Sequence, residues 1–212
     1  MPWFYYVTRV IVRILLFLLT RCQVKGRENI PRQGPLLIIS NHLSLIDPPL
    51  LNVTLDRKMM FMAKKQLFHF RVIGYLVRGF GAFPVHRGQL DRQALRQAYQ
   101  VLADGLALIM FPEGMRSRRG QLRPAFFGAA LIASRSGAPI LPIGISGTEK
   151  LERLSWWWRR PKITVNIGHP FHLSPPRSKL TRGELAELTR SIMQHIAELL
   201  PQEYRGDYPD EN

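Results

Sequence analysis

The stretch LLIISNHLSLIDPP, Leu36 to Pro49, changes character twice within a few residues. The apolar run Leu36 to Ile39 predicts a buried strand. Asp47 followed by Pro48 predicts a helix start, because aspartate is a good N-cap and a proline at the first helical position needs no donor. The residues between, Ser40 to Ile46, then form a loop. Strand, loop and helix in this order are typical of an α/β fold.

His42 and Asp47 stand out in this stretch because a buried ionisable group is costly unless it is paired. A continuous helix would hold them about 140° apart, whereas a loop can bring them together. One Asp47 oxygen would then accept from the backbone and the other from the imidazole, which leaves the second ring nitrogen as a base. The alternative is an aspartate cap beside an unrelated surface histidine. On this stretch alone the alternative is favoured, because caps are common and bases are rare.

The rest of the chain alternates between strand-like and helical patterns. The strand-like apolar runs are Leu36–Ile39, Lys58–Ala63, Ala82–Val85, Ala107–Phe111, Pro139–Ile145 and Ile163–Ile167. Helical patterns occupy Pro48–Leu55, Phe68–Gly79, Leu90–Ala103, Gly128–Ser136 and, after a capping box at Thr181 to Glu184, a final helix to about Leu200. Such alternation predicts an α/β fold with a mostly parallel sheet flanked by helices. A chain of 212 residues favours one domain, which we place at 23–212 after an N-terminal helix at 1–22.

The N-terminal segment Trp3 to Cys22 is rich in aromatic and aliphatic residues. A spanning helix is disfavoured because Arg9 and Arg13 interrupt the apolar run. A signal peptide is disfavoured because the segment lacks the small residues of a cleavage site. The two arginines lie on one stripe with the apolar residues elsewhere, which favours a helix in the membrane interface over an ordinary core-packed helix. Arg9 and Arg13 would then reach the anionic lipid phosphates, and the helix would hold the protein on the cytoplasmic face of the cell membrane without crossing it.

The net charge of the chain limits the classes of binding partner. Lys and Arg number 30 against 15 Asp and Glu, so the net charge of +15 favours nucleic acid, an anionic lipid surface or a phosphorylated substrate. Nucleic acid is least supported, since no zinc-finger, basic-zipper or RNP-like pattern is present. Cys22 is the only cysteine, which excludes an internal disulfide and fits a reducing compartment. His169 and His172 lack further ligands nearby, so no metal site is expected.

Charged residues follow several of the predicted strands. In α/β sheets, binding and catalytic sites usually lie in the loops beyond the carboxyl ends of the strands. Arg87, Arg116 and either Lys64 or Lys65 could converge on a phosphate, and Glu113 could hold a hydroxyl. The alternative for any one of them is a solvated basic surface.

Four blocks in order resemble the 1-acylglycerol-3-phosphate acyltransferases of the glycerolipid acyltransferase superfamily. They are the N-H-x-x-x-x-D block at Asn41 to Asp47, G-x-x-P-V-x-R at Gly81 to Arg87, F-P-E-G-x-R-S at Phe111 to Ser117 and a proline-containing apolar block at Ala138 to Gly147. Met115, where the family often has threonine, and Gln66, where it often has an acidic residue, are mild departures.

The resemblance implies roles for seven residues. His42 would be the general base for the sn-2 hydroxyl of a 1-acylglycerol 3-phosphate, and Asp47 would orient it. Glu113 and Gly114 would position the glycerol. The phosphate would be held by Lys64, Arg87 and Arg116, with Lys65 as a possible substitute for Lys64. The acyl donor would be acyl-CoA or acyl carrier protein, and no metal or other cofactor would be needed.

Other functions remain open. A lipase or esterase with Ser44 or Ser146 as nucleophile is disfavoured, since no G-x-S-x-G elbow is present. An acyltransferase for another lysophospholipid or a glycolipid, or a non-catalytic lipid-binding protein, also fits part of the pattern. The cluster Trp156 to Trp158 suits either a membrane interface or a partly packed loop.

Overall fold

The computed structural model describes residues 3–86, 91–152, 160–174 and 180–208. Its centre is a seven-stranded sheet with the order β1-β7-β6-β2-β5-β3-β4. The strands are β1 (Arg21–Lys25), β2 (Leu36–Ser40), β3 (Met59–Lys64), β4 (Ala82–Val85), β5 (Ala107–Met110), β6 (Ile140–Ser146) and β7 (Lys162–Ile167). All neighbouring pairs are parallel except β6 and β7. The predicted fold class and the six predicted strands are therefore confirmed.

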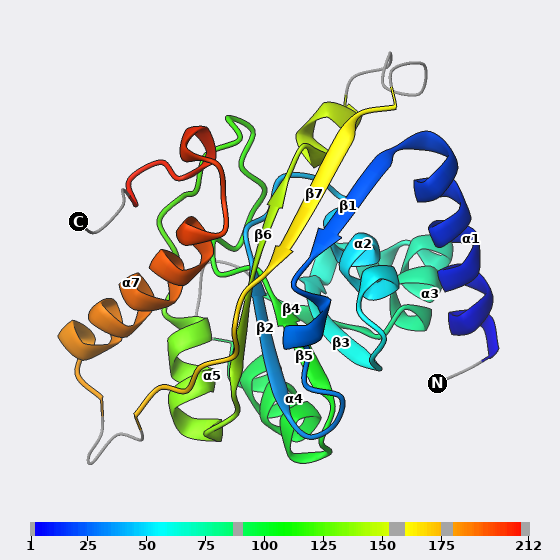
Figure 1. The fold of residues 1–212 in the computed structure, drawn as a ribbon. Helices are drawn as coiled ribbons and strands as arrows, with labels where there is room; N and C mark the ends of the chain where they lie inside the picture. Colours follow the sequence, from blue (N-terminus) through cyan, green and yellow to red (C-terminus); the bar gives the residue numbers. More distant parts are fainter. Residues whose placement is uncertain (1–2, 87–90, 153–159, 175–179, 209–212) are drawn as a thin grey trace.

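Helices cover both faces of the sheet (Figure 1). On one side lie α1 (Trp3–Leu19), α2 (Asp47–Thr54) and α3 (Arg71–Gly79), and on the other lie α4 (Arg92–Ala103), α5 (Gly128–Ser136) and α7 (Arg182–Glu198). Short 3-10 helices occur at η1 (Arg27–Asn29), η2 (Lys65–His69), η3 (Thr148–Glu152) and η4 (Gln202–Tyr204). The predicted capping box opens α7, with Thr181 and Glu184 each satisfying the other's backbone N–H.

Strand β2 lies at the middle of the sheet, between β5 and β6. Every residue of β2 is buried, as expected for a parallel strand that is covered on both faces. One core cluster packs between the sheet and α4, α5 and α7, and a second packs between the sheet and α1 and α2. The loops that leave the carboxyl ends of β2, β3 and β5 therefore start from a rigid base.

One face of helix α1 packs against the rest of the protein, and the other face is exposed. Tyr5 is fully buried and its hydroxyl accepts a hydrogen bond of 3.2 Å from the Asn52 side chain of α2. Arg9 donates to the Leu55 carbonyl at 3.1 Å and lies 3.9 Å from Asp56. The expectation that Arg9 reaches lipid phosphates is therefore wrong, because its guanidinium is held at the end of α2. Strand β1 also begins at Arg21, inside the segment that we assigned to the N-terminal helix.

The remaining face of α1 is apolar and exposed. Its exposed side chains are Tyr6, Val7, Val10, Ile11, Ile14, Leu15, Phe17 and Leu18. Within the described ranges, no helix is both long enough and apolar enough to cross a membrane.

Candidate active site

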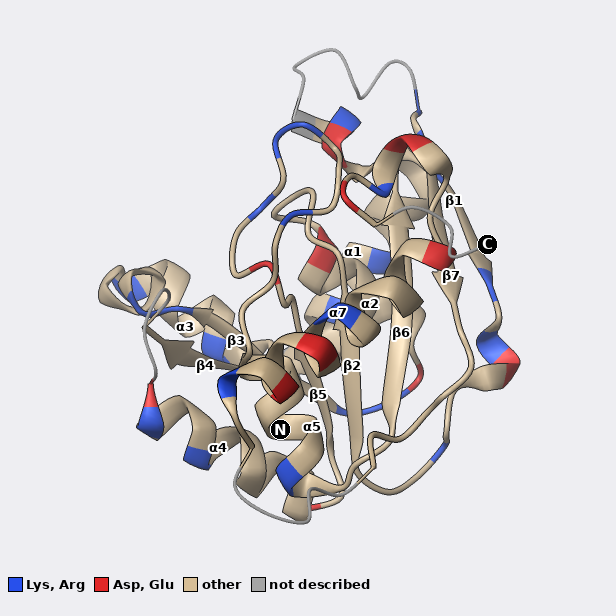
Figure 2. Ribbon diagram, turned by 90° about the vertical axis from the view of Figure 1, so that its left-hand side faces the viewer, with Lys and Arg blue, Asp and Glu red and all other residues tan. Residues whose placement is uncertain are grey.

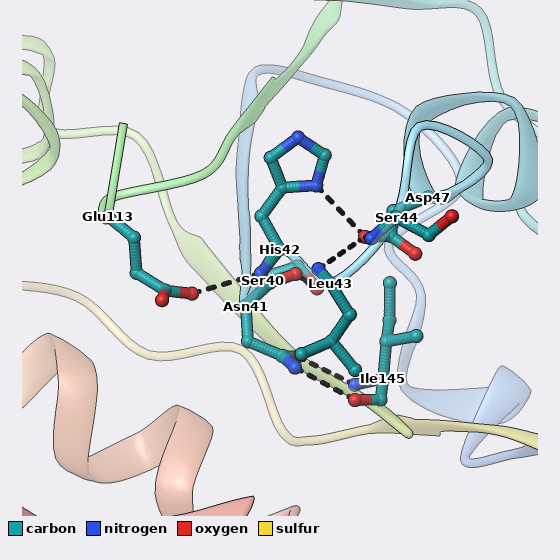
Figure 3. Close-up of polar contacts among 8 residues, drawn as sticks. All are labelled: Ser40, Asn41, His42, Leu43, Ser44, Asp47, Glu113 and Ile145. Carbon is teal, nitrogen blue, oxygen red and sulfur yellow. Dashed lines mark hydrogen bonds and ion pairs between the residues drawn. The ribbon is translucent and has the colours of Figure 1, made fainter. Parts of the chain in front are cut away.

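The loop after β2 brings His42 and Asp47 into direct contact. Nδ1 of His42 lies 2.9 Å from Oδ2 of Asp47, and both side chains are almost completely buried (Figure 3). A carboxylate in this position accepts the Nδ1 proton, which leaves Nε2 as the basic nitrogen. Figure 3 shows Nε2 on the side of the ring that is turned away from Asp47. The pairing of the two residues that we weighed in the sequence is thus present.

The expected capping role of Asp47 is wrong. Asp47 is the first helical residue of α2, and Ile46 precedes it as an N-cap without a side-chain hydrogen bond. Oδ2 reaches back over the loop and accepts from the backbone N–H groups of Leu43 and Ser44, both at 2.7 Å, as well as from His42. The other oxygen, Oδ1, has no hydrogen-bond partner among the described residues. One oxygen thus fixes both the loop and the imidazole.

Asn41 anchors the same loop, a role that we did not predict. Its amide donates to the Ile145 carbonyl at 2.8 Å and accepts from the Ile145 N–H at 2.7 Å, so it pairs with β6 as a strand residue would (Figure 3). Asn41 is only 1% exposed. A signal was available in the sequence, because an asparagine directly after a buried strand has to satisfy both ends of its amide.

Glu113 fastens the loop after β5 to the histidine loop. Its Oε1 accepts from the backbone N–H of His42 at 3.0 Å, and its Oε2 accepts from the N–H of Arg123 at 3.1 Å. A bond of 2.7 Å from the Ser117 N–H to the His42 carbonyl adds a second tie. Because both oxygens of Glu113 engage backbone groups, a direct contact with the glycerol stays a prediction.

Burial raises the pKa of the Glu113 carboxyl to about 7, and the charge of Asp47 adds to the rise. The backbone hydrogen bonds from His42 and Arg123 act in the opposite direction, since they favour the ionised form. Near neutral pH this carboxyl is therefore close to its titration midpoint.

Two neighbours shape the surroundings of the histidine. The ring of Phe111 stacks on the imidazole of His42, with 4.3 Å between centroids. Gly114 adopts a φ of 67°, and a Cβ there would lie 2.7 Å from the Phe126 ring. The turn after Glu113 therefore requires glycine.

His42 opens into a large basic cavity of about 920 Å³. Lys64 and Arg116 line it, as expected for phosphate ligands. Three further cations also line it and were not predicted, namely Arg118, Arg119 and Arg123. Figure 2 shows Lys and Arg segments on the loops beyond the strand ends. Asp207 is the one acidic residue among the described residues that line the cavity, so five cations against one carboxylate attract an anion.

The other predicted residues fall elsewhere. Lys65 does not line this cavity, and its Nζ lies 3.2 Å from Nε2 of His86. Gly114 lines a different, mainly apolar cavity. Arg87 and the cluster Trp156 to Trp158 lie outside the described residues.

Two mainly apolar cavities flank the basic one, on opposite faces of the sheet. The first, of about 340 Å³, lies between the sheet and α4 and α5 and includes Phe111 and Ile132. The second, of about 580 Å³, lies between α1 and the histidine loop and includes Leu16 and Ile46. The site thus combines a buried His–Asp pair, a cavity lined mainly by cations and two apolar cavities, an arrangement that is typical of an α/β enzyme.

Comparisons with known proteins agree with this class. The family model described as Acyltransferase matches residues 21–146, which is more than half of the chain. The chain belongs to this acyltransferase family.

Individual relatives carry more specific names. A 1-acyl-sn-glycerol-3-phosphate acyltransferase of Bacillus subtilis is 28% identical, over 89% of this chain and 92% of that protein. A chloroplastic enzyme of the same name from Brassica napus is 30% identical over 69% of this chain, but this chain spans only 43% of it. The crystal structure of the 1-acyl-sn-glycerophosphate (LPA) acyltransferase PlsC from Thermotoga maritima is similar with a TM-score of 0.69 and 26% identity, over 89% of this chain and 76% of that one.

Proposed function

We propose that this chain is a 1-acylglycerol-3-phosphate acyltransferase that converts lysophosphatidic acid to phosphatidic acid. The observation that carries the proposal is the buried His42–Asp47 pair, with 2.9 Å between Nδ1 and Oδ2, at the wall of a cavity lined by five cations. The names of the relatives from Bacillus subtilis and Thermotoga maritima support the choice of acceptor.

In the proposed reaction, Nε2 of His42 takes the proton of the sn-2 hydroxyl while that oxygen attacks the thioester carbonyl of the donor. The new C–O bond forms, the C–S bond breaks, and the thiolate leaves with the proton from His42. Asp47 holds the imidazole in the correct tautomer and stabilises its charged form. The step needs no metal ion or other cofactor, because the base and the thioester together supply the chemistry.

The acceptor phosphate would bind Lys64 and Arg116, with Arg87 as the third ligand that the sequence suggests. Arg118, Arg119 and Arg123 leave further positive charge for an anionic donor, which would be acyl-CoA or acyl carrier protein. The exposed apolar face of α1 supports work at the anionic cytoplasmic surface of the cell membrane.

The test is an acceptor panel assayed with purified protein and both donors. We expect thiol release and a new ester with 1-acylglycerol 3-phosphate, and a large loss with acceptors that lack the phosphate. His42→Ala should bind acceptor but show no turnover. Because this variant keeps the exposed Cys22, it also gives the background signal from that thiol when thiol release is measured with a thiol reagent. Equal turnover of acceptors with and without phosphate would favour another head group, and lipid binding without turnover would favour a non-catalytic lipid-binding protein.

A further inference from the structure

The cavity between α1 and the histidine loop has no role in the chemistry described so far. Its lining is mainly aliphatic and comes from four parts of the chain, with Val12, Leu15, Leu16, Leu19, Ile46 and Leu151 among its apolar members. We call this 580 Å³ cavity the α1 groove. Its size is in the range that holds small ligands.

The α1 groove meets the basic cavity at two residues. Leu45 and Arg116 line both cavities. The lining is therefore mainly apolar on one side of these two side chains and mainly cationic on the other. The bond of 2.7 Å from the Ser117 N–H to the His42 carbonyl fixes this junction beside the catalytic histidine. A ligand that crosses the junction must therefore be apolar at one end and anionic at the other, with its middle near His42.

The α1 groove also borders the exposed apolar face of α1. Leu15 lines the groove and is 47% exposed, and its neighbours Ile11, Ile14 and Leu18 are about equally exposed. An aliphatic chain can thus pass from an apolar surface into the groove without crossing a polar barrier.

We infer that the α1 groove binds the acyl chain already present on the lysolipid acceptor, at sn-1, while the phosphate of the same molecule lies in the basic cavity. The inference rests on the proposed function and adds a subsite to it. The acyl chain of the acceptor would then be kept apart from the acyl chain of the donor, because the apolar cavity beside Phe111 lies on the opposite face of the sheet.

The first experiment measures kcat/KM without membranes for monomeric acceptors whose sn-1 chain grows from about four to about ten carbons. Full burial of one methylene corresponds to about a fourfold change, so the wild type should gain roughly tenfold or more over the series. Leu15→Gln should flatten this gain. Leu18→Gln is the matched control, since Leu18 is exposed on the same helix but does not line the groove, and it should keep the wild-type dependence.

The outcomes separate the inference from the proposed function. If the wild type acylates none of these acceptors, the proposed function fails. If it acylates all of them with the same kcat/KM, or if Leu15→Gln and Leu18→Gln give the same chain-length dependence, only the groove assignment fails. Circular dichroism and the rate with the shortest acceptor check that both variants are folded.

The second experiment places a photoreactive diazirine at the end of the sn-1 chain and maps the labelled peptide by mass spectrometry. The inference predicts label on residues 12–19, 45–46 or 151. Label on α4 or α5, which line the other apolar cavity, would overturn it.

Discussion

The side chain of Asn41 and the backbone of Ile145 form two hydrogen bonds, of 2.8 and 2.7 Å, that join the histidine loop to β6. Asn41→Ala should lower the free energy of unfolding by about 3 kcal/mol, because it leaves a buried N–H and a buried carbonyl without partners. It should also lower kcat, since the loop that positions His42 is released. Thermal unfolding and steady-state kinetics measure the two effects.

Asn166→Ala is the matched control for Asn41→Ala. The Asn166 amide also bonds a backbone carbonyl, that of Leu199 at 2.7 Å, but it lies on β7 away from the histidine loop. It should cost stability and leave kcat near the wild-type value. Equal kcat losses in the two variants would show that Asn41 has no specific positioning role.

Two substitutions at Asp47 should separate its charge from its structural role. Asparagine retains an oxygen that can accept from Leu43 and Ser44, and its NH₂ would replace Oδ1, which has no partner among the described residues. Asp47→Asn should therefore unfold close to the wild-type temperature while kcat falls roughly 10²-fold or more, because the imidazolium loses its counter-charge. Asp47→Ala should lose both stability and rate. An Asn variant with wild-type kcat would contradict the assignment.

Glu113 gives the fold a dependence on pH. Its pKa is about 7 in the folded state against an ordinary value of 4.5, so the folded state binds more protons between these limits. Stability from this group is therefore fully present below pH 4.5 and is lost as the pH rises through 7. Denaturant unfolding at pH 5 and pH 8 should show this contribution, at about 1.4 kcal/mol per pKa unit, and Glu113→Gln should remove it.

Glu187→Gln controls for the loss of one carboxylate, since Glu187 is exposed on α7. The comparison uses the difference between each variant and the wild type at the same pH, because other groups titrate in this range. A constant difference between Glu113→Gln and the wild type from pH 5 to pH 8 would refute the raised pKa.

Lys64 and Lys65 form a matched pair for the phosphate site. Lys64 lines the basic cavity, whereas Lys65 lies against His86. Lys64→Ala should raise the acceptor KM about tenfold, because a charge-assisted contact is lost in both ground and transition states. Lys65→Ala should leave the acceptor KM nearly unchanged. A raised acceptor KM in Lys65→Ala but not in Lys64→Ala would identify Lys65 as the phosphate ligand instead.

All strands except β1 and the order of elements were predictable from sequence, because buried strands appear as continuous apolar runs between helical patterns, whereas β1 is mostly exposed and lacks such a run. The details of the site were less accessible. Asp47 followed by proline indicated a cap, yet its carboxylate turned back because two loop N–H groups and the imidazole compete for it. Arg118, Arg119 and Arg123 were not singled out from sequence, since only the folding of their loop beside His42 places them in one cavity. A one-dimensional pattern does not carry that information.

The last prediction concerns the exposed face of α1, where Phe17 is 74% and Val10 56% exposed. If this face docks on a lipid leaflet, the double variant Val10→Ser, Phe17→Ser should bind anionic vesicles at least about tenfold more weakly, since each side chain contributes about 1.5–3 kcal/mol when fully buried in an apolar phase. Sedimentation with vesicles of anionic phospholipid measures the binding. Turnover of a short-chain acceptor in solution should stay near the wild-type value, because neither residue lines the cavities next to His42. Vesicle binding equal to that of the wild type would show that α1 does not hold the enzyme on the membrane.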